Sequence, residues 1–420
     1  MDKFVIRGSQ PLKGQLKVEG SKNAALPIIA GALLIDAGET VIRNIPPLRD
    51  IFTIIKVIEY LGAKVDYDAS KQVMSIRAEQ LTQNDAPYDL MRQMRASFLM
   101  LGPILARQGS ARISLPGGCV LGARPVNFHI KAFQAMGAKV TEDGGFVLAK
   151  GSPLAGGQVY FDRPSHTGTE NVLFGAVLAK GKTRIVNAAC DPEVIDVAEF
   201  LNKAGARISG AGTPIITVEP VRRLKALEFR VQGDRLVAGT FMFGAAMTKG
   251  DVRLKGINPL CLEVVIQKLR EMGCQVDSTH NGLRVRGPKR LKAVSITTFP
   301  YPGFPTDLQA CAMAATCLAD GTSHIRETVF SDRFSHTMEM SRLGADITIA
   351  GDEAVIVGVP KLTGAKIMAS DIRAGAGIIL AALAAKGNSE VLRVYHVDRG
   401  YSQIEEKLTA LGADVTRVKE

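Results

Sequence analysis

The chain has 420 residues, 46% of them hydrophobic and 22% charged, which suits two domains of roughly 200 residues better than a single core. Its 52 Lys and Arg against 41 Asp and Glu leave a formal charge of +11, which favours an anionic partner such as nucleic acid, a membrane surface or a phosphorylated metabolite. The basic residues are scattered rather than gathered in runs, which argues against nucleic acid and membranes and favours one focused anion site.

The N-terminal segment and the apolar stretches argue against membrane insertion. The first eight residues, Met-Asp-Lys-Phe-Val-Ile-Arg-Gly, are strand-like and lack the apolar core of a signal peptide. The longest apolar stretches, near Ala24–Ile35 and Ala374–Ala385, run for only about 12 residues, too few to cross a bilayer. We therefore expect a cytosolic protein.

A helix-ending pattern recurs six times along the chain, at intervals of 68 to 75 residues. In each copy a Gly followed by Ala or Cys ends an amphipathic helix, and a Val or Ile three positions after the Gly begins a strand. In chain order the six glycines are Gly62, Gly137, Gly205, Gly273, Gly344 and Gly412.

A second pattern keeps the same step: a Gly opens an alternating strand, and a loop and another helix follow. The loops carry Pro, Gly, charge or Cys, which loops commonly contribute to functional sites. Six such α/β units divide into two domains of three, whereas an open solenoid fits less well because the loops are so different. The glycines are Gly38, Gly109, Gly181, Gly250, Gly321 and Gly387.

The six cysteines form no Cys-x-x-Cys pair, and the six histidines lack metal-ligand spacing, so neither a disulfide framework nor a zinc site is expected. Cys119 differs from the others because two glycines precede it and Arg124 follows, a setting that exposes a thiol and lowers its pKa. The remaining five are interpreted as buried small hydrophobes: Cys190, Cys261, Cys274, Cys311 and Cys317.

Eight short motifs together resemble the UDP-N-acetylglucosamine enolpyruvyl transferases. Each motif alone is weak, but all eight in the family's order, from the first strand to the last helix, are highly specific. The motifs are Gly20-Ser-Lys-Asn-Ala-Ala-Leu-Pro, Met94-Arg-Ala-Ser, Leu115-Pro-Gly-Gly-Cys, Gly122-Ala-Arg-Pro-Val, Phe304-Pro-Thr-Asp, Thr328-Val-Phe, Asp371-Ile-Arg-Ala and Tyr395-His-Val-Asp-Arg-Gly-Tyr.

The resemblance implies an α/β fold of two inside-out domains, each with three βαβαββ-like repeats whose helices lie behind sheets. Residues 1–20 and 233–420 would form the lobe that carries the base and the phosphoenolpyruvate arginines. Residues 21–232 would form the lobe with the Cys loop and the nucleotide-sugar contacts. The first strand would belong with the C-terminal half, and the reaction would occur in the cleft between the lobes.

The implied reaction transfers the enolpyruvyl group of phosphoenolpyruvate to the 3-hydroxyl of UDP-N-acetylglucosamine and releases phosphate, as the first committed step of peptidoglycan synthesis. No metal or organic cofactor is implied. The substrates bring a carboxylate, a monophosphate and a diphosphate, which the planar fork of arginine pairs well. The residues implied to bind phosphoenolpyruvate are Lys22, Arg95, Arg124, Arg333, Asp371, Arg373 and Arg399.

Protonation of the enol at C3, addition of the sugar hydroxyl at C2 and loss of phosphate together need an acid and a base. The resemblance implies Cys119 as the acid and Asp307 as the base, with Lys22 bridging to the transferring phosphate. It also implies that the epoxide antibiotic fosfomycin alkylates Cys119.

The nucleotide sugar is implied to contact residues on several loops. Phe128 would stack on the uracil, while His129 is as readily a core residue as a contact. Ser21 also suits a helix N-cap, whose anion preference agrees with a site role. The implied contacts are Asn23, Arg95, Arg124, Pro125, Val126, Asn127, Phe128, Ser165, His166, Thr167, Asp307 and Val329.

The sequence departs from the family pattern at four places, the first of which spans two residues. His166 and Thr167 displace a glycine of the diphosphate turn by one position, to Gly168. Val237 stands where a glutamate is common, Asn127 where an aspartate is usual, and Arg49 replaces a lysine. These departures bear on nucleotide affinity and domain closure more than on the reaction.

Three alternatives remain at this point. The sister enzymes that act on shikimate 3-phosphate lack the Pro-Gly-Gly-Cys loop. A catalytically silent paralogue that binds UDP-sugars as a regulator is motivated by His166, Thr167 and Val237. A nucleic-acid-binding repeat protein rests on the net charge alone.

Overall fold

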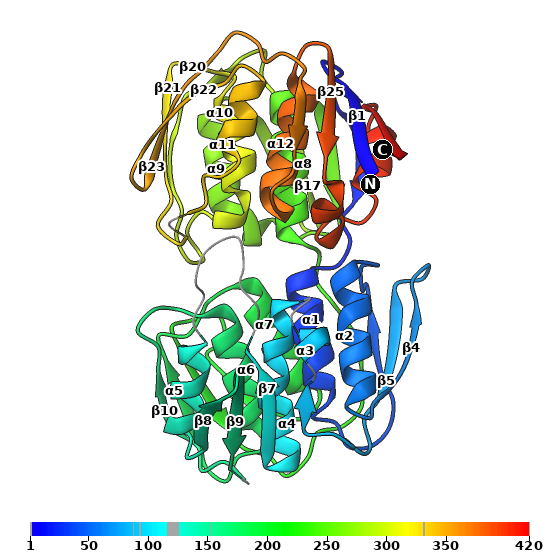
Figure 1. The fold of residues 1–420 in the computed structure, drawn as a ribbon, viewed down its shortest axis with the longest axis vertical. Coiled ribbons are helices and arrows are strands. Elements are labelled where there is room, and N and C mark those ends of the chain that lie inside the picture. Colours follow the sequence, from blue (N-terminus) through cyan, green and yellow to red (C-terminus); the bar gives the residue numbers. More distant parts are fainter. Residues whose placement is uncertain are drawn as a thin grey trace. The chain divides into compact units, whose positions relative to one another are not determined.

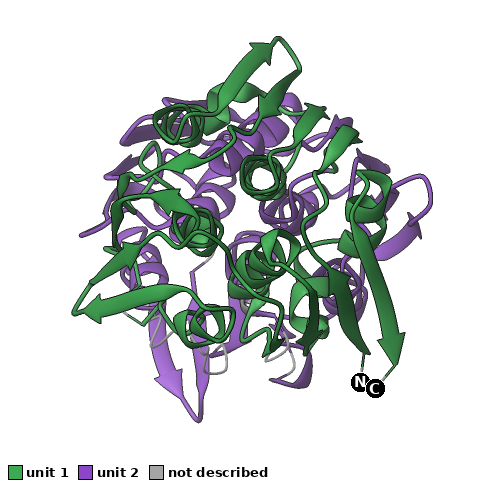
Figure 2. Ribbon diagram, turned by 90° about the horizontal axis from the view of Figure 1, so that it is seen from above, with its two compact units in different colours: residues 1–19, 120–122, 233–420 green, residues 20–119, 123–232 purple. Residues whose placement is uncertain are grey.

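The computed structural model describes residues 2–86, 88–91, 94–115, 126–151, 153–330 and 332–419. They form two compact units (Figures 1 and 2). Unit 1 contains the described residues up to Glu19 and from Gly233 onward, and unit 2 contains those from Gly20 to Gln232. Each unit has its own hydrophobic core.

Unit 2 contains three four-stranded sheets of one pattern, in the orders β14-β3-β5-β4, β6-β7-β9-β8 and β10-β11-β13-β12. In each sheet the first two strands are parallel and the others antiparallel. The strands are β3 (Thr40–Arg43), β4 (Lys64–Asp68), β5 (Val73–Arg77), β6 (Asp85–Ala86), β7 (Ser110–Ser114), β8 (Lys139–Asp143), β9 (Phe146–Lys150), β10 (Gly157–Tyr160), β11 (Thr183–Val186), β12 (Arg207–Ser209), β13 (Ile215–Glu219) and β14 (Glu228–Arg230).

Unit 1 repeats this pattern in the sheets β2-β15-β17-β16, β19-β21-β23-β22 and β24-β25-β1-β26, with a small β18-β20 pair besides. Strand β1 completes the last sheet between β25 and β26, which confirms that the first strand belongs with the C-terminal half. The strands are β1 (Asp2–Arg7), β2 (Lys13–Lys17), β15 (Asp251–Lys255), β16 (Gln275–Thr279), β17 (Gly282–Arg286), β18 (Leu291–Lys292), β19 (Ser295–Thr297), β20 (Ala319–Asp320), β21 (Thr322–Arg326), β22 (Asp346–Ala350), β23 (Glu353–Val357), β24 (Lys366–Met368), β25 (Asn388–Leu392) and β26 (Asp414–Lys419).

Each unit has central helices, most of which are buried nearly all round, and apolar residues predominate in them. In Figure 2 the helices of unit 1 are seen end-on, with its strands around them. The central helices are α1 (Lys22–Ala32), α4 (Leu101–Gln108) and α6 (His166–Val177) in unit 2, and α8 (Arg235–Met247), α10 (Gln309–Thr316) and α12 (Ile372–Ala384) in unit 1.

The other helices are short or amphipathic. The helix Arg49–Tyr60, for example, buries Ile51, Ile54 and Ile58 on one stripe. These helices are α2 (Arg49–Tyr60), α3 (Tyr88–Met91), η1 (Arg95–Met100), α5 (Asn127–Ala135), α7 (Pro192–Lys203), η2 (Pro259–Leu262), α9 (Glu263–Glu271), η3 (Thr306–Leu308), α11 (Thr337–Arg342), η4 (Val394–Arg399) and α13 (Ile404–Ala410).

The repeated helix-ending pattern has the predicted conformation in all six copies. Helices α2, α5, α7, α9, α11 and α13 each end just before the patterned Gly, and a strand begins two residues after it. The six glycines have φ between 89° and 107°, a left-handed conformation that costs other residues more than Gly.

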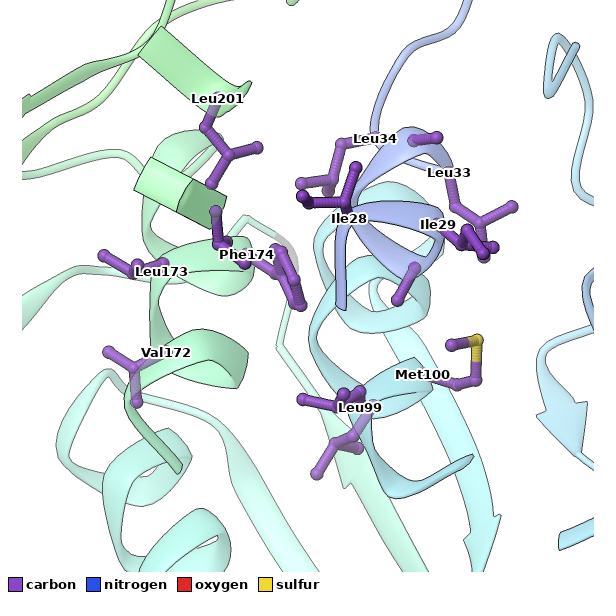
Figure 3. Close-up of a cluster of buried hydrophobic side chains, with 14 of the residues drawn as sticks. Ile28, Ile29, Leu33, Leu34, Leu99, Met100, Val172, Leu173, Phe174 and Leu201 are labelled. Atoms are coloured by element: carbon purple, nitrogen blue, oxygen red, sulfur yellow. The ribbon is translucent and has the colours of Figure 1, made fainter. Parts of the chain in front are cut away.

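The core of unit 2 forms where α1, η1, α6 and α7 pack together (Figure 3). Phe174 of α6 lies against α1, where its ring would be 3.0 Å from a Cβ placed on Gly31. The glycine therefore lets the two helices approach. Among the described residues, no helix is long and apolar enough to cross a membrane.

Candidate active site

The candidate site of unit 1 centres on a carboxylate held between two arginines. Asp307 lies in η3, at the start of the central helix α10, and each of its oxygens faces one guanidinium. Arg333 Nη2 lies 2.8 Å from Oδ1, and Arg373 Nε donates to Oδ2 at 3.0 Å. Both arginine side chains are only 7% exposed, so solvent screens these charges weakly.

This pairing fixes the charges of all three groups. Burial alone would raise the pKa of the Asp307 carboxyl, but Arg333 and Arg373 outweigh it and hold this pKa well below its usual range. Burial likewise works to lower the pKa of Arg373, and nearby Tyr401, Asp307 and Asp234 reverse that effect and raise it. The cluster is therefore fully ionised at neutral pH, with two positive charges around one negative charge.

A buried glutamate organises the loop beside this cluster. Glu327 is 2% exposed and accepts hydrogen bonds from the hydroxyls of Thr298 and Thr306, both at 2.8 Å. It also accepts from the backbone N–H groups of Val329 and Phe330. Because Arg333 in turn donates to Thr306 Oγ1 at 2.8 Å, the glutamate helps to orient the guanidinium.

Tyr401 contacts Arg373, the second arginine of the cluster. Its hydroxyl is buried, lies 2.8 Å from Thr240 Oγ1 and hydrogen-bonds to Arg373. Burial raises the pKa of this tyrosine to about 12, although Arg373 works against the shift. The phenol therefore stays neutral at physiological pH.

The remaining predicted residues of unit 1 lie at helix ends. Asp371 caps α12 and accepts from the backbone N–H groups of Arg373 and Ala374 at 2.8 and 2.9 Å. Arg399 ends η4 and is half-buried. Val329 lies in the loop that Glu327 organises.

In unit 2 the predicted site residues begin at the N-terminus of α1. Ser21 caps this helix as expected, accepting from the N–H of Ala24 at 3.3 Å. Lys22 is 7% exposed and its ammonium lies 3.0 Å from Asp50 Oδ2, while Asn23 is half-buried. The lysine is thus held by a carboxylate that the sequence did not indicate.

Helices α5 and α6 bring a second group together. The buried His129 ring lies 3.0 Å from Asn171 Nδ2 and 3.5 Å from Thr167 Oγ1, and packs edge-on against Phe98. It is therefore a core histidine with polar partners, of which Thr167 was predicted as a site residue. Phe128 is half-buried and turns its edge toward another ring, that of Phe161.

The start of α6 carries the departures from the family pattern. Ser165 caps the helix and accepts from the N–H of Gly168 at 3.1 Å. His166 Nε2 lies 3.3 Å from Glu170 Oε1, and Glu170 is completely buried. Burial raises the pKa of Glu170 to about 8, partly offset by His166 and reinforced by the carboxyls of Glu193 and Asp191.

Several predicted residues cannot be placed. Cys119, Arg124 and Pro125 lie outside the described residues, and Arg95 starts η1 with its side chain outside them. Val126 and Asn127 directly follow residues 116–125, which are not described; Val126 is buried and Asn127 is exposed.

The expectation for the other cysteines was partly wrong. Three of them, Cys274, Cys311 and Cys317, are buried as expected, and burial raises the pKa of each thiol to about 12. Cys190 and Cys261 are only half-buried: Cys190 lies in the loop before α7, and Cys261 lies in the short helix η2. In the described part of the chain, no cluster of His, Cys, Asp and Glu could hold a metal ion.

Sequence reasoning missed the supporting residues more than the central ones. Tyr401 and Thr306 lay inside motifs already singled out, so their motifs were an available signal. Asp50 and Glu327 had no such signal, because Lys22, Thr298 and Thr306 lie more than 20 residues from them in sequence. Glu170 is only four residues from His166, but its complete burial follows from the folded core.

The fold and this cluster define a two-unit α/β protein with buried arginines suited to multiply charged anions. The family model described as EPSP synthase (3-phosphoshikimate 1-carboxyvinyltransferase) matches residues 6–408. The fold resembles the enolpyruvyl transferase NikO from Streptomyces tendae (TM-score 0.90, 22% identity, covering 100% of this chain and 99% of the other). It also resembles EPSP synthase from Acinetobacter baumannii (TM-score 0.76, 19% identity, full coverage of both).

Sequence relatives are much more similar. A UDP-N-acetylglucosamine 1-carboxyvinyltransferase from Myxococcus xanthus is 50% identical, and one from Geobacter metallireducens 49%, both over all 420 residues and the full length of both chains. The chain therefore belongs to the EPSP synthase family and, within it, to the UDP-N-acetylglucosamine 1-carboxyvinyltransferases. This confirms the resemblance and the inside-out α/β fold class predicted from the motifs.

Proposed function

We propose that this protein transfers the enolpyruvyl group of phosphoenolpyruvate to the 3-hydroxyl of UDP-N-acetylglucosamine and releases phosphate. The step would commit the sugar to peptidoglycan synthesis in the cytoplasm. The full-length identity to carboxyvinyltransferases of this name supports the reaction. The observation that carries the chemistry is the Arg333–Asp307–Arg373 cluster, which combines two fixed cations with a candidate base.

Phosphoenolpyruvate would replace Asp307 as the anion that contacts Arg333 and Arg373. Its carboxylate and phosphate can each accept bidentate hydrogen bonds from a guanidinium. Arg373 and Arg333 are already buried, so the anion binds cations whose desolvation was completed on folding. Asp371 fixes the backbone at Arg373, and Arg399, Arg124, Arg95 and Lys22 are the further cations proposed for the same anions.

This exchange explains how Asp307 can act as a base. While both arginines face it, its depressed pKa makes it a weak proton acceptor. When the arginines turn to the substrate anions, the opposing charge around Asp307 falls and its pKa rises. The carboxylate then accepts the proton of the sugar hydroxyl as oxygen adds to C2 of phosphoenolpyruvate.

The acid of the reaction is proposed from the motif alone. Cys119 would protonate C3, and elimination of phosphate with loss of a C3 proton would then restore the double bond in the product. Lys22 would contact the transferring phosphate, for which it must exchange its contact with Asp50 for one with the substrate.

The nucleotide sugar would be bound mainly by unit 2. The proposed contacts in the described part of that unit start at helix ends, where N–H groups favour anions: Asn23 on α1, Val126, Asn127 and Phe128 at α5, and Ser165, His166 and Thr167 at α6. We propose Asp307 and Val329 of unit 1 as further contacts with the sugar.

The decisive experiment incubates the purified protein with phosphoenolpyruvate and UDP-N-acetylglucosamine and follows the enolpyruvyl sugar by mass spectrometry, with phosphate release measured in parallel. We expect product with this acceptor and none with shikimate 3-phosphate. Binding of the nucleotide sugar without product would indicate the silent paralogue, and product only with shikimate 3-phosphate would identify the sister activity.

Cys119→Ser tests the acid. Turnover should fall sharply while UDP-N-acetylglucosamine binding changes only a few-fold, because the thiol serves the chemical step. Fosfomycin should add one mass increment to the wild type, at Cys119, and none to the variant. Cys274 is the internal control, since its pKa of about 12 leaves almost no thiolate. An unchanged rate in Cys119→Ser would remove this residue from the mechanism.

A further inference from the structure

A second group of basic residues lies around a pocket in unit 1, away from the arginine cluster. A pocket of about 730 Å³ opens where the C-terminal ends of the central helices α8 and α12 meet the loops that follow them. We call it the cationic pocket, because no Asp or Glu of the described chain lines it, whereas six basic residues do: Arg7, Lys249, Lys289, Arg290, Lys361 and Lys386.

The pocket has an apolar floor beneath this basic rim. Met247 and Leu291 line it and are 5% and 3% exposed, and Ala246 and Ala384 come from the last turns of α8 and α12. Gly8 forms part of the wall, where any Cβ would overlap the carbonyl oxygen of Ala385. The basic side chains are exposed and can reach a ligand that rests on the floor.

Neutralisation of helix ends does not account for so much positive charge. The C-terminus of a helix carries roughly half a negative charge, so α8, α10 and α12 together offer about one and a half. Asp320 removes one more positive charge, through its ion pair with Arg290 at 3.1 Å. Of six positive charges, more than three remain uncompensated by these groups.

Unit 2 shows how this fold neutralises helix ends when that is the only task. Arg107, in the last turn of α4, donates to the carbonyl oxygens of Leu33, Ala78 and Glu79, and Arg223 pairs with Asp36 at 3.3 Å. In the described part of unit 1, the side chains of Arg7, Lys249, Lys289, Lys361 and Lys386 make no such hydrogen bond or ion pair. Their charges are available to a ligand.

We propose that the cationic pocket binds a small phosphorylated metabolite, with phosphates at the basic rim and an organic body on the floor. The volume is that of a typical small-molecule site. No aromatic side chain of the described residues lines it, so the base stacking that single-stranded nucleic acid uses is missing. The pocket includes the C-terminal ends of α8 and α12, and the N-terminal ends of these helices carry Asp234 and the Asp371–Arg373 segment. A bound metabolite would therefore contact the same two helices that hold the arginine cluster.

The test is a calorimetric titration with two probes, inorganic triphosphate and ADP, without phosphoenolpyruvate. The pocket variant is Lys289→Gln with Lys361→Gln, and the control variant is Lys13→Gln with Lys255→Gln, which removes two exposed charges of unit 1 outside the pocket. We expect saturable binding of both probes to the wild type, at least about tenfold weaker in the pocket variant and within twofold in the control. ADP should bind more tightly than its charge alone predicts, because its adenosine can pack on the apolar floor of the pocket.

In this titration, either of two results would overturn the proposal: no saturable binding of either probe at millimolar concentration, or equal weakening in both variants, which would indicate general electrostatic attraction. Preferential binding of RNA or acidic peptide over both probes would overturn it as well. The transferase activity of the pocket variant, measured without probe, should equal that of the wild type. A negative result in the probe titration would therefore not affect the proposed transferase function.

Discussion

At the scale of single residues, the site is governed by how buried charges are shared. Asp307 is held between two buried arginines, and Lys22 against Asp50, so before substrate binds each of these charges has a partner inside the protein. A buried cation without a counter-charge would cost several kcal/mol. The carboxylates therefore keep the cations in place until substrate anions replace them.

Replacing Asp307 by Asn tests both roles of this carboxylate. The amide keeps the shape, but it can neither accept the hydroxyl proton nor neutralise Arg333 and Arg373. We expect kcat to fall by about 100-fold or more, as for loss of a general base. Asp352→Asn is the control, since Asp352 pairs with Arg326 at an exposed position. Steady-state kinetics that show equal rates for both variants would refute the role of Asp307.

Tyr401→Phe tests whether the phenol positions Arg373. The variant keeps the ring and loses the hydroxyl that contacts Thr240 and Arg373. We expect the KM for phosphoenolpyruvate to rise several-fold with little change in kcat, and the free energy of unfolding to fall by about 1 kcal/mol. Tyr395→Phe, in the neighbouring helix η4 and 38% exposed, should change neither. A loss of stability without a KM effect would make Tyr401 purely structural.

At the scale of secondary-structure elements, the sequence predicted most of the architecture. The glycine pattern located the ends of six helices, because only a left-handed residue closes the helix and turns the chain into the next strand there. It could not give the pairing of strands, which depends on contacts between distant segments. The family resemblance implied only that the first strand belongs with the C-terminal half, and its place between β25 and β26 comes from the structure.

The same limit applies to the site. The family resemblance named Asp307, Arg333 and Arg373, but only the folded chain shows the arginines paired with that carboxylate, and Glu327 in support. The stacking of Phe128 on uracil stays a prediction, and its T-shaped contact with Phe161 had no signal in the sequence.

Phe174→Ala tests the packing of the central helices in unit 2. The ring is fully buried and lies close to Gly31 of α1, so its removal leaves a cavity that rigid helices cannot fill. We expect a loss of about 3–5 kcal/mol in the free energy of unfolding, measured with denaturant. Phe299→Ala, at a position 55% exposed, should cost far less. Equal losses would mean that burial is not what makes Phe174 important.

At the scale of the whole molecule, buried carboxyls should set the pH dependence of stability. Burial raises the pKa of Glu170 to about 8 and that of Asp196 to about 7, from ordinary values of 4.5 and 3.8. Between its ordinary and its raised pKa, each of these carboxyls is protonated in the folded chain and ionised in the unfolded chain. The contribution of these groups to stability is therefore complete below pH 4 and is lost as pH rises toward 8.

Glu170→Gln isolates the larger of these contributions. Glutamine resembles the protonated carboxyl in shape and stays neutral, so the variant does not have to hold a proton that the unfolded chain releases. From pH 5 to 8 the wild type should lose stability relative to the variant by on the order of a few kcal/mol, seen as diverging melting temperatures. Glu142→Gln, on the exposed part of β8, should follow the wild type at every pH. Parallel curves for wild type and Glu170→Gln would show that Glu170 is ionised in the folded protein, with its charge balanced by His166 3.3 Å away.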